Sequence, residues 1–254
     1  MISQKEFYEL YNKNSKRNIS RNSGPIDARL FLRNLSLPIA YLLAKNNVSA
    51  NAVTVVFLLI ALAGNFLLVI PSVFTIILLI IFHEVAWLFD CVDGQLARYH
   101  GTFSKYGENF DTLSHVIVSG TFMLAFGTRI YLESGQAMFL LLGGIGAFAK
   151  AFEQQLEISK KSISESPKVK SMYYHSKIRK YIVYGVQTII TEIRIFSIVV
   201  LILTLIQPNT IRINFVELSF IAMVLVVFLE SFVYKIYLSI KQLGFVERKV
   251  WKGW

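Results

Sequence analysis

The chain has 254 residues, of which 54% are hydrophobic and 17% are charged, and its formal net charge is +10. Soluble domains are about 45–50% apolar. The excess here falls in runs of about 20 residues, the length that crosses a hydrocarbon core, and this excludes one large soluble core. Lys and Arg lie between those runs, as in cytoplasmic loops that face anionic lipids. The positive charge therefore indicates a lipid bilayer as the partner and no nucleic acid.

The N-terminal part of the chain is polar and basic. Residues 1–25 are predicted to be a polar basic extension, helical in part at most. From Ile26 to Lys45 the pattern becomes amphipathic, and Arg29, Arg33 and Ser36 follow one another at spacings of three to four on its polar face. A helix of this kind lies in the membrane interface and does not span the bilayer. Pro38 is expected to bend it.

Six apolar segments follow and predict an all-α integral membrane protein. Residues 26–254 then form one membrane domain, in which six transmembrane helices are preceded by the amphipathic interfacial helix. No internal repeat divides it. The predicted spans cover approximately residues 51–70, 73–98, 106–131, 136–152, 181–206 and 215–240.

The distribution of basic residues predicts the orientation of this multi-pass protein. Lys and Arg concentrate in the N-terminal segment, between Lys150 and Lys180, and in the C-terminal tail. Segments rich in Lys and Arg stay on the cytoplasmic side. Both termini are therefore expected to be cytoplasmic, and the connection between the second and third spans falls on that same side.

Acidic residues in and beside the second and third spans carry the strongest functional signal. Asp90 and Asp93 are one helical turn apart, and so are Asp111 and His115 on the next span. Ionisable groups inside a membrane are expensive and usually functional. Carboxylates that approach one another need a cation between them, and hard oxygen ligands suit Mg²⁺ or Mn²⁺. The spacing predicts a divalent-metal site.

Small residues and an arginine accompany these acids. Gly94 follows Asp93 directly, and Gly107 lies one turn before Asp111. A missing side chain lets a nucleotide or phosphate approach the backbone. Arg98 is one turn beyond Gly94, where its guanidinium can bind a phosphate with two parallel hydrogen bonds. Metal, glycines and arginine together favour phosphoryl transfer.

The segment from Phe89 to His115 resembles the signature of the CDP-alcohol phosphotransferases, D-x2-D-G-x2-A-R-x8-G-x3-D-x3-D. The sequence provides seven of its eight defined residues at the matching positions, namely Asp90, Asp93, Gly94, Ala97, Arg98, Gly107 and Asp111. Asn51 and Thr54 also resemble the N-x-x-T pair that opens the family's first span. The six predicted spans and the amphipathic helix agree with the family's architecture.

The resemblance implies a chemistry and a role for each residue. Signature aspartates bind one or two divalent metals, which hold the diphosphate of a CDP-linked donor such as CDP-diacylglycerol. The hydroxyl of an alcohol or polyol-phosphate acceptor attacks the β-phosphorus, and CMP leaves. By this resemblance Asp90, Asp93 and Asp111 are metal ligands, and Asp111 also serves catalysis. Gly94, Ala97 and Gly107 would admit the cytidine nucleotide, while Arg98 would stabilise phosphate charge.

The eighth signature position departs from the family, because His115 replaces an aspartate. An imidazole with an ordinary pKa of about 6.5 can act as the base that deprotonates the acceptor. It can equally bind the metal, which would shift preference toward Mn²⁺ or Zn²⁺ relative to Mg²⁺. The alternatives are altered chemistry or a nucleotide-binding pseudoenzyme. An ion-coupled transporter would also use intramembrane acids, but it does not require the glycines and arginine at these spacings.

Three other polar residues in the predicted spans are candidates. His83 and Glu84 lie about two turns before Asp90. They either shape an acceptor site or form a buried hydrogen bond between helices. Arg194 opens the membrane part of the fifth span, where the family often carries a basic residue that faces the acceptor; a charge paired at the interface is the alternative.

Small residues also recur on the fourth predicted span. Gly143, Gly144 and Ala147 lie on it at short spacing. Small residues let membrane helices approach closely. They therefore predict tight helix packing, either within one chain or at the seam of a homodimer.

Overall fold

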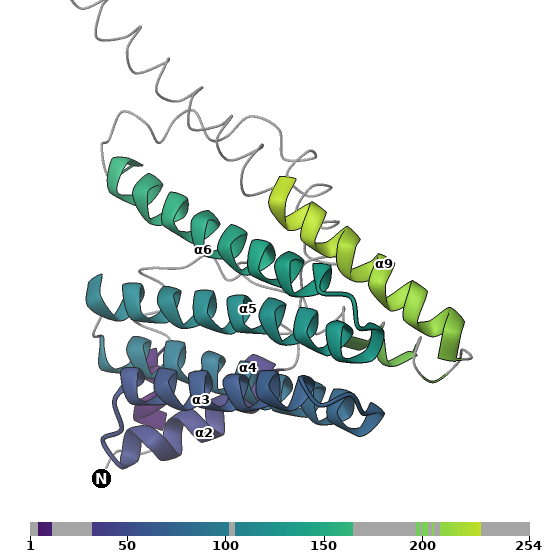
Figure 1. Ribbon diagram of the computed structural model, residues 1–254. Coiled ribbons are helices and arrows are strands. Elements are labelled where there is room, and N and C mark those ends of the chain that lie inside the picture. The colour runs from purple at the N-terminus through teal and green to yellow at the C-terminus, as the bar shows by residue number, and fades with distance from the viewer. Residues whose placement is uncertain are drawn as a thin grey trace, which may run out of the picture. The chain divides into compact units, whose positions relative to one another are not determined.

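The computed structural model describes residues 5–11, 32–101, 105–164, 197–198, 200–202, 205 and 209–229. Within these residues the chain is helical and contains no strand, which confirms the predicted all-α class. The described residues belong to two compact units, one ending at Val118 and the other beginning at Ser119. The helices are α2 (Arg33–Lys45), α3 (Ala50–Leu68), α4 (Val73–His100), α5 (Lys105–Ser134), α6 (Met138–Ser164) and α9 (Asn209–Phe228) (Figure 1).

Three of the described helices are long and apolar enough to cross a membrane. They cover Ala50–Leu68, Val73–His100 and Tyr106–Ser134, with mean hydropathies of 2.2, 2.0 and 1.3. These helices coincide with the first three predicted spans. The fourth and sixth predicted spans correspond to the shorter apolar helices Met138–Phe152 and Val216–Phe228. Most of the fifth lies outside the described residues, so the count of six remains a prediction.

The first unit is built on the antiparallel pair α3 and α4, which a short connection joins. Ser49 begins α3 by accepting a hydrogen bond from the backbone N–H of Ala52, and Ser72 begins α4 by accepting one from Phe74. Such hydroxyl caps satisfy backbone donors that a helix leaves unpaired. Helix α4 ends at Gly101, whose φ of 65° favours glycine. The helix therefore carries the signature residues from Asp90 to Arg98 in one unbroken element.

Helix α2 packs on α4 through a row of small residues. Ser36, Ala40 and Ala44 are buried at four-residue intervals. Gln95 of α4 donates from Nε2 to Ser36 Oγ (2.7 Å) and to the carbonyl oxygen of Arg33 (2.9 Å). The sequence pattern placed Ser36 on the polar face of this helix. Its hydroxyl instead faces the protein, because the small side chain and a buried amide partner compensate for its polarity.

The N-terminal segment contains more packed structure than its composition indicated. Residues 5–11 are helical, and the side chain of Phe7 is fully buried. Its ring centroid lies 4.9 Å from that of Tyr99 and 5.8 Å from that of Tyr41. The Phe7 ring packs this short helix against α2 and α4, and a buried Phe contributes a large apolar surface.

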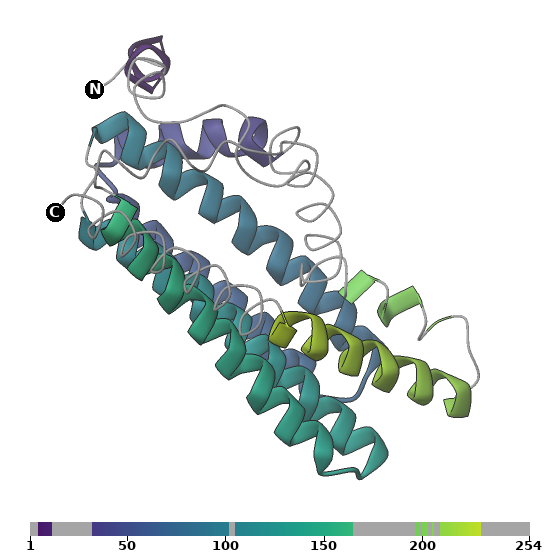
Figure 2. The ribbon, with the colours of Figure 1, turned by 90° about the horizontal axis from the view of Figure 1, so that it is seen from above.

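The second unit contains close contacts between helices. A Cβ atom on Gly143 of α6 would lie 2.9 Å from the carbonyl oxygen of Met123 and 3.5 Å from Gly127 Cα, both on α5. This confirms the close packing predicted for Gly143, whereas a Cβ on Gly144 would meet nothing within 4 Å. Helices α6 and α9 lie side by side (Figure 2), and the Phe220 ring of α9 packs on Phe126 of α5, 5.2 Å away.

Candidate active site

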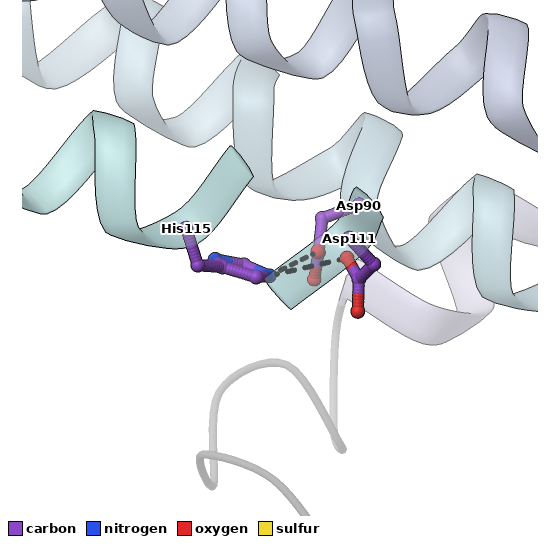
Figure 3. A group of neighbouring side chains, drawn as sticks. All are labelled: Asp90, Asp111 and His115. Atoms are coloured by element: carbon purple, nitrogen blue, oxygen red, sulfur yellow. Dashed lines mark ion pairs between the residues drawn. The ribbon is translucent and has the colours of Figure 1, made fainter. Parts of the chain in front are cut away.

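Helices α4 and α5 bring together three of the predicted site residues. His115 Nε2 lies 3.0 Å from Asp90 Oδ1 and 3.5 Å from Asp111 Oδ1 (Figure 3). Asp111 and His115 meet because they are one turn apart on α5, and Asp90 approaches them from α4. All three side chains are partly exposed: His115 by 33%, Asp90 by 22% and Asp111 by 46%. The group is therefore held by two helices and open on one side.

These three donor atoms fit a divalent metal. They all lie within 4.8 Å of one another. Two ligand atoms about 2.1 Å from a shared ion are roughly 3.0 Å apart at a right angle and roughly 3.4 Å apart at a tetrahedral angle. The separations of 3.0 and 3.5 Å between His115 and the carboxylates match these values. Two oxygens and one imidazole nitrogen suit Mn²⁺ and Zn²⁺ as well as Mg²⁺.

Aromatic rings enclose the imidazole of His115. The ring of Phe57 on α3 lies 5.0 Å from it, and the ring of Trp87 on α4 lies 5.5 Å from it, between centroids. Phe57 is 1% exposed. Aromatic contacts at these separations favour a defined ring orientation. The imidazole is thus packed between two helices while Nε2 faces the carboxylates.

Asp93 lies deeper than the other signature aspartates and has a partner on α3. Its side chain is buried, and its Oδ2 atom lies 2.7 Å from Thr54 Oγ1. Thr54 is itself buried and also lies 3.2 Å from the carbonyl oxygen of Ala50. A hydroxyl that donates to a carboxylate fixes the direction of its oxygens. The structure therefore gives Thr54 of the N-x-x-T pair a contact with the signature, whereas Asn51 is exposed.

The remaining signature residues lie along the same two helices. Gly94 faces the guanidinium of Arg98, since a Cβ atom on Gly94 would be 3.4 Å from Arg98 Nη1. Ala97 precedes Arg98 in the last turns of α4, and both are partly exposed. Gly107 lies in the first turn of α5, one turn before Asp111. Small side chains thus accompany Arg98 and the acids on both helices.

Two of the secondary candidates, His83 and Glu84, lie on α4 within the described residues. His83 is buried, and its Nε2 atom lies 2.9 Å from Asn65 Oδ1, so the hydrogen bond between helices is confirmed for it. Glu84 is partly exposed on the same helix. Arg194 lies outside the described residues. The acceptor side of the predicted site therefore stays a prediction.

Sequence reasoning missed Phe57 and Trp87, which pack on His115, and Asn65, which contacts His83. Phe57, Trp87 and Asn65 lie within continuous apolar or aromatic stretches and match no part of the signature. For Phe57 and Trp87 the one indication in the sequence was their spacing: Phe57 is one turn after Thr54, and Trp87 is one turn before Asp90. Such spacing identifies a shared helix face. It does not identify the helix that packs on that face.

The comparison with known families agrees with this geometry. None of the curated proteins compared with the chain matches it. Residues 47–165 match the profile of the CDP-alcohol phosphatidyltransferases, a family whose members transfer a phospho-alcohol group and use divalent metals. The match includes every signature residue from Asp90 to His115, as well as Thr54. The resemblance seen in the signature is thereby confirmed by a match to the CDP-alcohol phosphatidyltransferase family over residues 47–165.

Proposed function

We propose that the protein transfers a phospho-alcohol group from a CDP-linked donor to an alcohol acceptor and releases CMP. The observation that carries the proposal is the convergence of Asp90 Oδ1, Asp111 Oδ1 and His115 Nε2 within 4.8 Å inside the matched segment. A CDP-diacylglycerol donor with a polyol-phosphate acceptor is proposed, because helices long and apolar enough to cross a membrane carry the site. Both termini are proposed to be cytoplasmic, with the site on that side.

The metal site combines the clustered residues with Asp93. We assign Asp90, Asp111 and His115 as ligands because their donor atoms have separations typical of a shared ion. Asp93 is assigned as a further ligand, and Thr54 orients its carboxylate. A bound divalent cation, Mg²⁺ or Mn²⁺ with Zn²⁺ as a third candidate, would neutralise the donor's diphosphate charge. One histidine among these ligands favours Mn²⁺ over Mg²⁺.

The reaction is a displacement at phosphorus. The acceptor's hydroxyl oxygen forms a bond to the β-phosphorus of the donor, and the bond from that phosphorus to the CMP oxygen breaks. CMP leaves with the bonding electrons, and the acceptor's proton passes to a base. Asp111 is the more exposed carboxylate of the cluster, at 46%, and is the proposed base when His115 Nε2 is a ligand. His115 takes that proton when its nitrogen is free.

The other signature residues are proposed to bind the nucleotide. Gly94, Ala97 and Gly107 present no large side chain, so the cytidine and its phosphates can approach the helix backbones. Arg98 is partly exposed beside Gly94 and would stabilise the developing charge on phosphate. Because Arg98 and the carboxylate cluster lie at the same end of α4, one diphosphate can contact both.

A second function has its own structural support. The His115 imidazole, when protonated, is a cation placed between Asp90 and Asp111. An internal cation at that place can replace a metal and leave a site that binds nucleotide without turnover. The two functions differ in metal binding. A pseudoenzyme of this kind binds CMP without needing a metal, whereas the transferase needs both metal and acceptor.

The deciding experiment is CMP release by purified protein in nanodiscs. The protein is given CDP-linked donors and alcohol acceptors with Mg²⁺, Mn²⁺ or Zn²⁺ in turn. Asp111→Asn removes one proposed ligand, while Glu108→Gln removes a carboxylate from the preceding turn of α5 and serves as the matched control. Release that needs acceptor and metal, and that Asp111→Asn alone abolishes, supports the transferase. CMP binding without release by folded protein supports the pseudoenzyme.

A further inference from the structure

A buried polar link joins α3, α4 and α5 outside the carboxylate cluster. Asn65 of α3 donates from Nδ2 to the carbonyl oxygen of Val118 on α5, at 2.9 Å. Its Oδ1 atom lies 2.9 Å from Nε2 of His83 on α4. Asn65 is 2% exposed and His83 is 1% exposed. One short side chain thus connects three apolar helices in the first unit.

The chemistry of the partners fixes the direction of each hydrogen bond. A backbone carbonyl can only accept, so the amide nitrogen of Asn65 must face Val118. The amide oxygen then faces His83, which donates from Nε2. A flip of the Asn65 amide would therefore lose the bond to Val118. In an apolar surrounding such a loss is costly, because no water replaces the partners.

The residue before Asn65 allows this link to form. A Cβ atom on Gly64 would lie 2.9 Å from Phe82 Cβ and 3.3 Å from His83 Cδ2. Glycine at this position therefore lets α3 and α4 approach closely. At that approach the short amide of Asn65 reaches α4 and α5 together.

The link lies where it can control the geometry of the site. Val118 follows His115 by one turn of α5, and His83 precedes Asp90 by two turns of α4. A slip of α5 by one residue would move His115 by about 1.5 Å and rotate it by about 100°. The separation of 3.0 Å between His115 Nε2 and Asp90 Oδ1 would not survive that movement.

We propose that Asn65 is a positioning residue, which sets the register of α5 against α4 so that Asp90, Asp111 and His115 converge on one metal ion. This role depends on one part of the proposed function, namely that Asp90, Asp111 and His115 bind a metal ion. The two hydrogen bonds of Asn65 go to Val118 and His83, which lie outside the group of Asp90, Asp111 and His115. It acts through Val118 on α5 and through His83 on α4, so its removal changes where the ligands lie and leaves their identity unchanged.

The test compares Mn²⁺ binding by Asn65→Leu and by wild type, measured calorimetrically on full-length protein without nucleotide. Leucine has a similar size but donates no hydrogen bond. We expect the dissociation constant for Mn²⁺ to rise about tenfold or more, as for groups that orient ligands. Added Mn²⁺ should restore part of the CMP release, because the ligands remain present. A loss of stability alone would not produce this dependence on metal concentration.

Thr75→Val is the matched control. Thr75 is also buried on α4, but its hydroxyl lies 2.7 Å from the carbonyl oxygens of Ile70 and Ser72, which directly precede its own helix. Its Mn²⁺ affinity should equal that of wild type. If Asn65→Leu does not fold, Asn65→Gln is measured in its place, since glutamine keeps the amide but has a longer side chain.

The outcomes separate this role from the proposed function. Weaker Mn²⁺ binding by a folded Asn65 variant, with Thr75→Val unchanged, supports positioning. An unchanged Mn²⁺ affinity in folded Asn65→Leu overturns the positioning role and leaves the metal site intact. If only Asn65→Gln folds, an unchanged Mn²⁺ affinity in that variant has the same meaning. Wild-type protein that binds no Mn²⁺ overturns the metal site and the positioning role together.

Discussion

His115 Nε2 on α5 lies 3.0 Å from Asp90 Oδ1 on α4, so the residue that departs from the family signature contacts the first residue of that signature. The imidazole reaches this carboxylate because Phe57 and Trp87 pack on its ring. An aspartate at the same position would be shorter and would leave space between those two aromatic side chains. His115 thus places an imidazole nitrogen, in an aromatic setting, at the position where the family signature has a carboxylate.

His115→Asp restores the family signature, and we expect it to retain substantial CMP release while preference shifts from Mn²⁺ toward Mg²⁺. The reason is that an added carboxylate increases the negative charge and the hardness of the ligand set. CMP release measured across a series of Mg²⁺ and Mn²⁺ concentrations checks this. A folded variant without activity under either metal would show that the site depends on imidazole.

Asp93→Ala should lower CMP release by more than about 100-fold, because loss of a ligand exceeds the 10–100-fold typical of groups that only orient ligands. Thr54→Val removes the hydroxyl 2.7 Å from Asp93 Oδ2 and keeps the side-chain shape. It should weaken metal binding by about 10–100-fold. Metal titrations of both variants measure these effects. Near-normal turnover by Asp93→Ala would refute the assignment of Asp93.

Much of the fold near the site could be predicted, because the signals are local. Apolar runs located α3, α4 and α5, and the spacing of Asp111 and His115 placed them on one face of a helix. The boundaries shifted where capping decided them: α4 continues to His100 because Gly101 adopts a positive φ. Ser36 was placed on the polar face of its helix because its partner, Gln95, is distant in the sequence.

The arrangement between helices was harder to predict. The signature indicated that Asp90, Asp93 and Asp111 act together, but it gave no sign of the contact between Asp93 and Thr54 on α3. Nothing in an apolar stretch indicates which helix its polar residue will face, so the contact of Asn65 with Val118 could not be foreseen. These contacts depend on how closely helices approach, and glycines such as Gly64 decide that approach.

Helix α5 contains a buried ion pair that gives a further prediction. Arg129 Nη2 lies 3.0 Å from Glu133 Oε1, and their side chains are 4% and 19% exposed. Glu133→Gln should destabilise the fold by about 1–3 kcal/mol, below the full effect for a deeply buried pair, because Glu133 retains some exposure. Thermal unfolding in detergent measures the change.

The double variant Arg129→Met, Glu133→Gln is the control for this effect. Removing both charges leaves no unpaired buried charge, so its unfolding temperature should lie closer to wild type than that of Glu133→Gln. A double variant less stable than Glu133→Gln would indicate that Arg129 contributes mainly through packing or other contacts.

Two neighbouring glycine sites in the second unit should respond in opposite ways to alanine. A Cβ atom on Gly127 of α5 would collide with the carbonyl oxygen of Phe139 and approach Gly143 Cα to 3.1 Å. A backbone atom cannot move aside as a side chain does, so Gly127→Ala should destabilise the protein by about 1–3 kcal/mol. A Cβ atom on Gly144 would meet nothing within 4 Å, so Gly144→Ala should be neutral, or stabilising by up to about 1 kcal/mol through helix propensity.

Unfolding temperatures of the two variants, measured in the same detergent, test this difference. Equal stability of both would mean that α5 and α6 do not pack through Gly127, whereas a destabilised Gly144→Ala would reveal a contact of that face with a second copy of the chain.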